Sequence, residues 1–335
     1  MKQLAIGIDL GGTNLKGIVM EPGGRHRHLT RVPTEAEKGG PRVLENILKL
    51  IGVLIEKEGG SEAIRGVGIG TPGFVDREGV MVGGAANLPG WVGTRLFEPI
   101  RERFGLRAAA ANDVTVAALG EARFGAGRGV RNMVCMALGT GIGGGVVIDG
   151  RVYNGTNGMA AELGHITVDV DGLQCNCGAR GCVEQYASAT GIVRVAQLEA
   201  ASYAGTTRSE LLTLVRDNAH GFDSKTVYDH VAQRDPFALH VNEVVCGKLG
   251  VAVGIVLNCF APDRLILGGG VMKAGRVIID TVSRYAPRYC WPEIWRRCEI
   301  HCAQLGEDAG VLGCGALVFD ALTEEGDERS READR

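Results

Sequence analysis

The sequence predicts an α/β protein of two lobes with a duplicated core of β-strands and helices. The chief observation is a pattern that occurs twice, in which a β-rich apolar run, a glycine turn and a second apolar run follow one another. A length of 335 residues, 45% of them hydrophobic, is enough for two lobes that each bury a core. We expect each lobe to present its glycine turn to a shared active-site cleft. The two blocks are residues 4–10 with 15–21, and residues 133–138 with 142–148.

The remaining elements follow from apolar spacing and capping residues. Residues 42–58 carry apolar side chains at helical spacing, including Val43, Ile47 and Leu50. Asp235 followed by Pro236 is typical of a helix N-cap with proline at the first helical position. The sequence also predicts strands at 66–70 and 264–267, and helices at 114–124, over most of 187–216, from 236 to about 259, and at 310–322.

These elements suggest where the lobes divide. We expect residues 1–113 to form the N-terminal lobe, completed by the helix at about 310–322. Residues 114–309 would form the C-terminal lobe, which includes a cysteine cluster. Residues 323–335 are rich in charge, so we expect a disordered tail.

Composition and charge argue against several classes of function. The net charge of −3 and a pI near 6.2 give no basic footprint of the kind that binds nucleic acid. The first apolar run ends at Asp9, too early for a secretory signal, and no uninterrupted apolar stretch approaches a membrane span. We therefore expect a cytoplasmic protein without nucleic-acid or membrane partners, whose ten cysteines are thiols or metal ligands.

The first glycine turn has groups that suit a phosphate and a metal ion. Gly11 and Gly12 let backbone N–H groups converge on phosphate oxygens, and Thr13 adds a hydroxyl donor. Asp9 can hold Mg²⁺ through water, and Lys16 supplies a positive charge. An ordinary glycine hairpin would show the same pattern, so the turn alone leaves both interpretations open.

Two later glycine clusters are further candidates for nucleotide contact. Gly139, Thr140 and Gly141 form a turn that leads back into a strand, unlike a Rossmann fingerprint, and no Gly-Lys-Ser/Thr follows as in a Walker A loop. Gly268 and Gly269 follow a predicted strand, where they leave room for an adenine-ribose group or simply for close packing.

Four residues have the chemistry and spacing of zinc ligands. Cys175, Cys177 and Cys182 lie close together, and His165 lies upstream of them. Cys₃His is a usual set for a closed tetrahedral zinc site, and the glycines between the cysteines permit sharp bends. Chance clustering is the alternative, since a disulfide is disfavoured in the cytosol. We predict a structural zinc, because protein ligands fill all four positions.

Asn112 and Asp113 follow the short apolar stretch 108–111 and open the helix at 114–124. A carboxylate at the end of a strand is well placed to accept a hydroxyl proton, as a general base does. Asp113 could instead cap the helix, and its position alone favours the cap.

Together these motifs resemble the ROK family of sugar kinases and regulators, and within it the zinc-containing, ATP-dependent glucokinases. The resemblance extends from Leu4 to about Leu322. It rests on Asp9-x-Gly11-Gly12-Thr13, Gly70-Thr71-Pro72-Gly73, Asn87-Leu88-Pro89-Gly90-Trp91, Asn112-Asp113, Gly139-Thr140-Gly141, Glu162-x-Gly164-His165 and the run from Cys175 to Glu184.

The resemblance implies the actin-like ATPase fold, which is ribonuclease H-like, with an active site between the lobes. It implies a glycolytic enzyme that uses ATP and Mg²⁺ to phosphorylate glucose at its 6-hydroxyl, with Asp113 as the general base, and a homodimer or homotetramer. The residues that match the family's sugar ligands are Gly73, Asn87, Asn112, Asp113, Glu162, His165 and Glu184. The nucleotide and metal contacts would be Asp9, Gly11, Gly12, Thr13, Lys16, Gly139, Thr140, Gly141, Gly268 and Gly269.

Alternatives remain within and outside enzymes. A kinase for N-acetylmannosamine or another hexose would carry the same motifs. The phosphate donor could be ATP or polyphosphate, and only the third glycine cluster favours ATP. A sugar-responsive regulator is the main non-catalytic alternative. Repressors of this family carry a helix-turn-helix before the first glycine turn, whereas only eight residues precede Asp9 here, which favours an enzyme.

Overall fold

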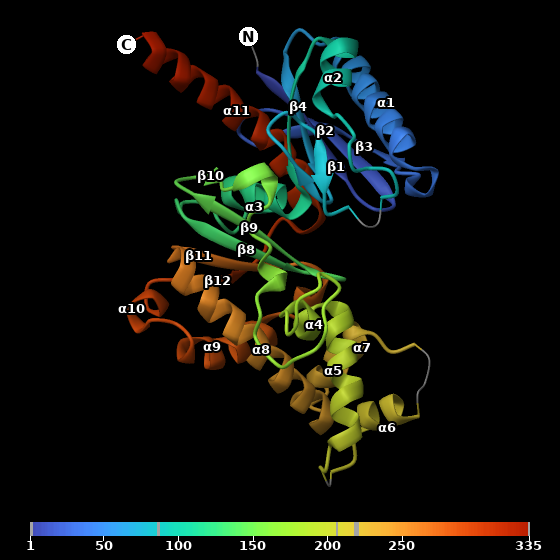
Figure 1. Cartoon of the computed structure of the whole chain (residues 1–335), viewed down its shortest axis with the longest axis vertical. Coiled ribbons are helices and arrows are strands. Elements are labelled where there is room, and N and C mark those ends of the chain that lie inside the picture. Colours follow the sequence, from blue (N-terminus) through green and yellow to red (C-terminus); the bar gives the residue numbers. More distant parts are fainter. Residues whose placement is uncertain (1–2, 86–87, 206, 218–220, 334–335) are drawn as a thin grey trace. The chain divides into compact units, whose positions relative to one another are not determined.

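The computed structural model describes the backbone of residues 3–85, 88–205, 207–217 and 221–333, and side chains as far as Leu322 (Figure 1). The chain forms two compact units. Unit 1 contains Met1–Arg131, Gly145–Ala161 and Gln304–Arg335, and unit 2 contains Asn132–Gly144 and Glu162–Ala303. The boundary that we placed between residues 113 and 114 therefore falls inside unit 1.

A five-stranded sheet with the order β3-β2-β1-β4-β7 forms the centre of unit 1. Strand β1 is antiparallel to β2 and parallel to β4, which is in turn parallel to β7. The first glycine turn joins β1 to β2, as predicted. The strands are β1 (Leu4–Leu10), β2 (Asn14–Met20), β3 (His26–Pro33), β4 (Ile64–Thr71) and β7 (Arg107–Asn112), and a separate hairpin pairs β5 (Phe74–Val75) with β6 (Met81–Gly83).

Helices cover both faces of this sheet (Figure 1). On one face, α1 (Gly40–Glu58) buries its predicted apolar stripe, and α2 (Phe97–Phe104) adds Ile100 to the same core. On the other face, α11 (Ala309–Ala333) packs directly on the backbone of β4. A Cβ atom at Gly68 would lie 1.8 Å from the carbonyl oxygen of Cys314, so only glycine permits this close approach.

Helix α3 (Asp113–Phe124) belongs to unit 1 because it packs against α11. Its Val116 and Leu119 share a buried cluster with Leu317, and a Cβ atom at Gly313 would lie 1.7 Å from the carbonyl oxygen of Val116. Helix α11 is longer than predicted, since its backbone stays helical past Leu322, where we placed the start of a disordered tail. The sequence beyond that point is rich in Glu and Arg, which are good helix formers.

The second sheet repeats the plan of the first, with the order β10-β9-β8-β11-β12. Strands β8 and β9 flank the second glycine turn, and β11 is parallel to both β8 and β12. The duplicated core is therefore confirmed, and the division between the units crosses β9. The strands are β8 (Met133–Leu138), β9 (Ile142–Ile148), β10 (Arg151–Val152), β11 (Arg264–Gly268) and β12 (Glu299–Cys302).

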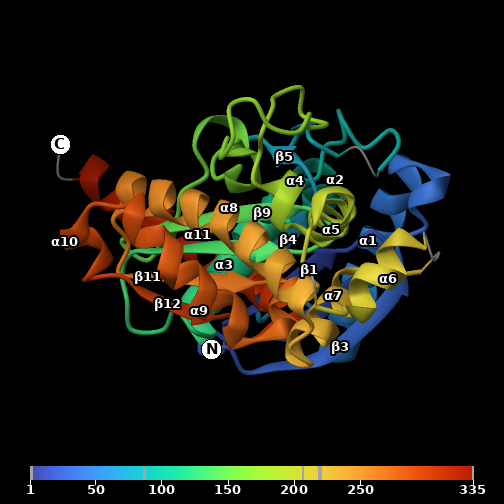
Figure 2. The same ribbon diagram turned by 90° about the horizontal axis from the view of Figure 1, so that it is seen from below.

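Helix α8 (Pro236–Phe260) is the longest helix of unit 2 and lies beside α5 and α9 (Figure 2). Asp235 caps it as predicted, accepting hydrogen bonds from the backbone N–H groups of Phe237 and Ala238. Among the described helices, α8 alone is long and apolar enough to cross a membrane, but its buried apolar side chains make it a core helix. The others are α4 (Glu184–Ala187), α5 (Ala189–Ser202), α6 (Glu210–Arg216), α7 (Ser224–Ala232), α9 (Arg276–Tyr285) and α10 (Pro292–Trp295).

Candidate active site and metal centre

Two carboxylates of unit 1 lie close enough to repel each other. Asp9 is the half-buried residue before the last residue of β1, and Asp113 begins α3 directly after β7. Because β1, β4 and β7 are parallel, the ends from which these residues project lie at one edge of the sheet. Burial and the neighbouring charge of Asp113 raise the pKa of Asp9 to about 6, an effect that Lys16 opposes. Burial likewise raises the pKa of Asp113.

This pair fits a divalent cation. Two carboxylates held together in a poorly solvated place repel each other, and a bound cation relieves that repulsion. Mg²⁺ is commonly held by one or two carboxylates together with phosphate oxygens and water. Asp9 is therefore suited to the magnesium role that the sequence predicted for it.

The N-cap of α3 is Asn112, not Asp113. The Oδ1 atom of Asn112 accepts hydrogen bonds from the backbone N–H groups of Val114, at 2.9 Å, and Thr115, at 3.4 Å. Asp113 also accepts from Val114, at 2.8 Å, but the helix start does not depend on it alone. This weakens the interpretation of Asp113 as a cap and leaves its carboxylate available for chemistry.

A second bond of Asn112 joins two residues predicted to bind sugar. Its Nδ2 atom donates to the carbonyl oxygen of Gly73 at 3.3 Å. Gly73 has a left-handed backbone with φ of 89°, and a Cβ atom there would lie 2.4 Å from the carbonyl oxygen of Gly83. The nearby Thr71 hydroxyl accepts a hydrogen bond from the buried indole N–H of Trp91, at 2.9 Å. Asn87, the other predicted sugar ligand of this region, lies outside the described residues.

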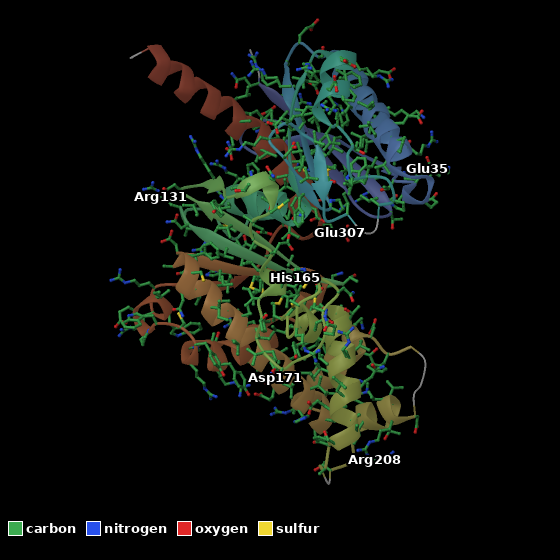
Figure 3. All side chains as sticks on the ribbon, in the orientation of Figure 1. Glu35, Arg131, His165, Asp171, Arg208 and Glu307 are labelled. Atoms are coloured by element: carbon green, nitrogen blue, oxygen red, sulfur yellow. The ribbon has the colours of Figure 1, made fainter. Side chains whose placement is uncertain are left out.

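The first glycine turn is tight and open to solvent. The backbone N–H of Gly11 donates to the carbonyl oxygen of Asn14 at 3.1 Å, while Gly12 has free space around it and, like Thr13, is exposed. Lys16 pairs with Asp9 across this hairpin, and its contact with a phosphate stays a prediction. Its Nζ atom donates to the carbonyl oxygen of Glu307 at 2.8 Å, so its charge is directed to the loop before α11 (Glu307 is labelled in Figure 3).

The four predicted zinc ligands come together in unit 2 (His165 is labelled in Figure 3). The ligand atoms of His165, Cys175, Cys177 and Cys182 all lie within 4.8 Å of one another. The Nδ1 atom of His165 is 3.6 Å from Sγ of Cys175, and Sγ of Cys177 is 3.6 Å from Sγ of Cys182. A tetrahedral zinc with Zn–S bonds of about 2.3 Å separates its sulfur ligands by roughly 3.8 Å. The geometry and the donor set therefore fit zinc.

The surroundings of the cluster also suit a metal-bound thiolate. Gln185 donates from Nε2 to Sγ of Cys175 at 3.3 Å. Burial and the neighbouring thiols raise the pKa of Cys182 to about 12, which is a cost that a bound cation would remove. The other ring nitrogen of His165, Nε2, lies 3.7 Å from a carboxylate oxygen of Glu162, so this histidine links the metal cluster to a predicted sugar ligand.

Glu184 connects the zinc segment to the second glycine turn. It lies two residues after the ligand Cys182, and its Oε2 atom accepts a hydrogen bond from the backbone N–H of Ile142 at 2.8 Å. A Cβ atom at Gly141 would lie 2.4 Å from the same oxygen, which explains the glycine there. The turn is held further by hydrogen bonds from the Ala189 N–H to the Gly139 carbonyl, and from the Thr190 hydroxyl to the Thr140 carbonyl. The sequence did not reveal this link, because it joins residues about forty positions apart.

The glycines of the third cluster have different surroundings: one is closely packed, and another lines an open cavity. Gly269 has a left-handed backbone, and a Cβ atom there would lie 2.4 Å from the carbonyl oxygen of Leu138, so it serves close packing. Gly268 is the last residue of β11. Beyond them, Gly270, Val271 and residues of α7 line a cavity of about 280 Å³. The α7 wall of this cavity was not anticipated from the sequence.

The predicted residues thus form two groups, one in each unit. The group in unit 1 consists of Asp9, Gly11, Gly12, Thr13, Lys16, Gly73, Asn112 and Asp113. The group in unit 2 consists of Gly139, Thr140, Gly141, Glu162, His165, Cys175, Cys177, Cys182, Glu184, Gly268 and Gly269. The single cleft between the lobes stays a prediction.

A sequence profile of the ROK family matches residues 5–321. The chain belongs to the ROK family. A glucokinase of Thermotoga maritima is 38% identical over 95% of this chain and 98% of its own length. The crystal structure of a ROK family glucokinase from Streptomyces griseus in complex with glucose and AMPPNP is 33% identical, with a TM-score of 0.73 over 94% of this chain and 98% of that one. The xylose repressor of Bacillus spizizenii is 27% identical over 94% of this chain and 77% of its own length.

These comparisons confirm the resemblance drawn from the motifs. The two related sheets with their helices are the actin-like ATPase fold of the ROK sugar kinases. The family also contains repressors, but the glucokinases that are 35–38% identical over nearly the whole chain show that this chain is a hexose kinase.

Proposed function

We propose that this protein is a cytoplasmic kinase that transfers the γ-phosphoryl group of ATP to the 6-hydroxyl of glucose. The observation that carries the proposal is the pair Asp9 and Asp113, two close carboxylates with raised pKa values beside an open glycine turn. A kinase needs one carboxylate to hold Mg²⁺ and another to accept the hydroxyl proton. A regulator that only binds sugar needs neither.

Each group of the pair has a defined task in this proposal. Asp113 accepts the proton of the 6-hydroxyl as that oxygen attacks phosphorus, and burial brings its pKa closer to neutrality than that of an exposed carboxylate. Asp9 would hold Mg²⁺, which would supply positive charge to neutralise the phosphate groups of ATP. The N–H groups of the two glycine turns donate to phosphate oxygens.

The zinc-bound segment would present the sugar. A zinc ion held by these four residues would have all its positions filled by protein, so its role would be to fix the backbone of this segment. Glu162, His165 and Glu184 then offer hydrogen-bond acceptors and donors to sugar hydroxyls. A site built from such hydrogen bonds discriminates strongly between sugars. Asn112 and Gly73 are the further sugar ligands that the resemblance implies. We also propose a homodimer or homotetramer, as the resemblance implies.

A sugar panel tests this function. We expect ADP release with glucose and ATP to exceed that with mannose, fructose, N-acetylmannosamine and N-acetylglucosamine in kcat/KM. Polyphosphate in place of ATP is expected to support less turnover, because the cavity beside Gly270 suits a nucleoside. A higher kcat/KM on N-acetylmannosamine or another hexose would replace glucose but keep the kinase. Sugar binding without any turnover would favour the regulator.

The raised carboxyl pKa values predict an acid limb in the pH dependence of kcat/KM. Both carboxylates act only when deprotonated, so kcat/KM is expected to fall as the pH drops through the apparent pKa of the pair, near the value of about 6 for Asp9. Initial rates at low substrate from about pH 5 to pH 8 measure this limb. A flat profile across that range would contradict the assigned roles. In Asp113→Asn the pKa of Asp9 loses the neighbouring charge that raises it and is expected to fall.

Replacing Glu184 with alanine is expected to weaken the binding of ATP as well as sugar. The change removes the acceptor of the Ile142 N–H and frees the second glycine turn. Loss of a hydrogen bond to a charged group corresponds to a rise of roughly tenfold or more in KM. Glu184→Gln keeps an oxygen acceptor for the turn, so its KM for ATP is expected to change less. An unchanged KM for ATP in Glu184→Ala would show that the turn does not depend on this bond.

A further inference from the structure

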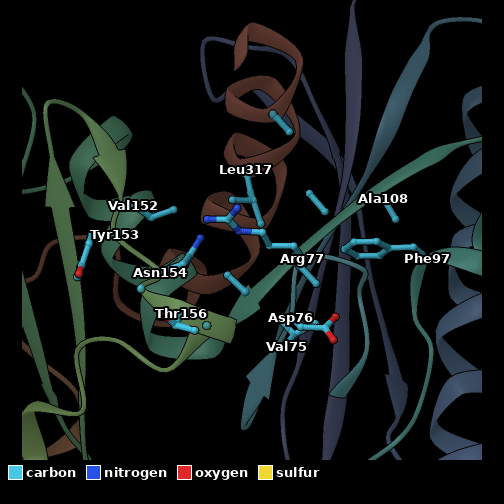
Figure 4. A pocket seen from close by; sticks show the side chains of 16 residues that line it. Val75, Asp76, Arg77, Phe97, Ala108, Val152, Tyr153, Asn154, Thr156 and Leu317 are labelled. Atoms are coloured by element: carbon cyan, nitrogen blue, oxygen red, sulfur yellow. The ribbon is translucent and has the colours of Figure 1, made fainter. Parts of the chain in front are cut away.

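Unit 1 contains a cavity of about 780 Å³ apart from the residues assigned to sugar, nucleotide and zinc (Figure 4). Within the described part of the chain, no residue assigned to those ligands lines it. We propose that this cavity is a binding site for a small organic anion with a partly apolar body. The lining comes from β5 and its following turn, from α2 and β7, from β10 and the loop after it, and from α11.

Two hydrogen-bond donors point into the same space from separate segments (Figure 4). Arg77 comes from the turn after β5, and Asn154 comes from the loop after β10. In the described ranges, neither side chain has a hydrogen bond or ion pair. The acidic residue of the lining, Asp76, is engaged in its own turn, where Oδ1 accepts from the backbone N–H groups of Glu78 and Val80. The cavity therefore offers a guanidinium and an amide without a protein acceptor, which favours a carboxylate, sulfonate or phosphate.

Part of the remaining wall is apolar, and the cavity leaves room for more than an inorganic ion. Phe97, Val152 and Leu317 line it together with four consecutive alanines of β7, residues 108–111. The alanine side chains of β7 are small, and among the described strands β7 pairs with β4 alone at the edge of its sheet. Neither a large side chain nor a further strand therefore fills the space. Pockets of about 300–1,000 Å³ are typical of organic ligands. An inorganic phosphate alone would leave most of this volume empty.

The lining segments lead directly into residues of the proposed sugar site. Val75 follows Gly73 by two positions, and Ala111 immediately precedes Asn112. Gly158 precedes Glu162 by four positions, and a Cβ atom at Gly158 would lie 2.5 Å from the carbonyl oxygen of Val75, so these loops touch. A ligand that holds these segments pre-organises their neighbours, which lowers the KM for sugar. This consequence rests on the proposed kinase function, whereas the binding site itself does not.

Fluorescence titration with 8-anilinonaphthalene-1-sulfonate, an anion with an aromatic body, tests the site. N-phenyl-1-naphthylamine supplies nearly the same body without charge, and inorganic phosphate supplies charge without the body. We expect the sulfonate to bind the folded protein more tightly than either. Arg77→Ala is expected to weaken its binding about tenfold, as for loss of a charged hydrogen bond. Arg77→Lys should lose less, and Arg101→Ala, which removes an exposed arginine outside the lining, should change the affinity less than twofold.

Two further measurements separate the site from general surface binding. Ala321→Phe places a ring into the cavity from α11 and is expected to abolish sulfonate binding without changing far-UV circular dichroism. In hydrogen exchange, the sulfonate should slow exchange of residues 74–77 and 153–158 in the wild type but not in Arg77→Ala. Equal sulfonate affinity in wild type, Arg77→Ala and Ala321→Phe would overturn the site. These binding measurements do not depend on turnover, so they test the site even if the protein phosphorylates no sugar. If the enzyme is active and the sulfonate leaves the KM for sugar unchanged, only the proposed effect of the ligand on sugar binding is refuted.

Discussion

Asp113→Asn is expected to lower kcat by about 10²–10⁴-fold, the usual contribution of a general base. Asparagine has nearly the shape of aspartate but cannot accept the proton of the 6-hydroxyl. The helix start survives the change, because Asn112 is the N-cap of α3 and keeps its bonds to the backbone of Val114 and Thr115. The affinity for sugar, measured by equilibrium titration without ATP, is therefore expected to change only a few-fold.

The matched control is Asn112→Asp, which keeps an oxygen acceptor for the helix start but removes the amide that donates to Gly73. This variant should lose sugar affinity more than it loses kcat, the opposite split to Asp113→Asn. A kcat near that of the wild type in Asp113→Asn would reject the base role. If Asp113→Asn lost sugar binding and also had a lower melting temperature, the role of Asp113 would instead be structural.

Much of the fold could be predicted from patterns of residues that are close together in the sequence. The apolar spacing in 42–58 predicted α1, and Asp235 with Pro236 marked the start of α8, because capping and helical periodicity are local properties. The repeated strand–turn–strand block predicted the duplicated sheet for the same reason. The assignment of α3 to unit 1 was not predictable, since it depends on the contact of Val116 with α11 across the sequence.

The candidate site shows the same division between local and distant information. Ligand type and spacing predicted the Cys₃His cluster, whose four donor atoms come within 4.8 Å. In contrast, the engagement of Lys16 with Glu307 and of Glu184 with Ile142 joins residues that no short motif contains. Gly269 illustrates a third case, in which one glycine pattern serves packing at one position while the neighbouring Gly270 opens to a cavity. Motifs therefore identified the chemistry, and tertiary contacts determined which atoms remain free for it.

Cys177→Ser is expected to release zinc and to raise the KM for sugar and for ATP together. Structural zinc sites bind with apparent free energies of about 10–16 kcal/mol, which are coupled to folding, so a lost ligand loosens the whole segment. His165 holds the link to Glu162, and Cys182 lies two residues before Glu184, whose carboxylate fixes the second glycine turn. The sugar ligands and the phosphate turn should therefore both lose their positions, and the melting temperature should fall.

The matched control is Cys259→Ser, which removes an exposed thiol on α8 away from the cluster. Elemental analysis should find about one zinc per chain in wild type and in this control, and almost none in Cys177→Ser. The decisive comparison is between the two KM values. If zinc only stabilised the fold, active Cys177→Ser protein would keep both values, whereas a metal that positions the site makes both rise. If the wild-type protein contains no zinc, the proposed metal site is wrong. Zinc would then not be what holds Glu162 and Glu184 in place.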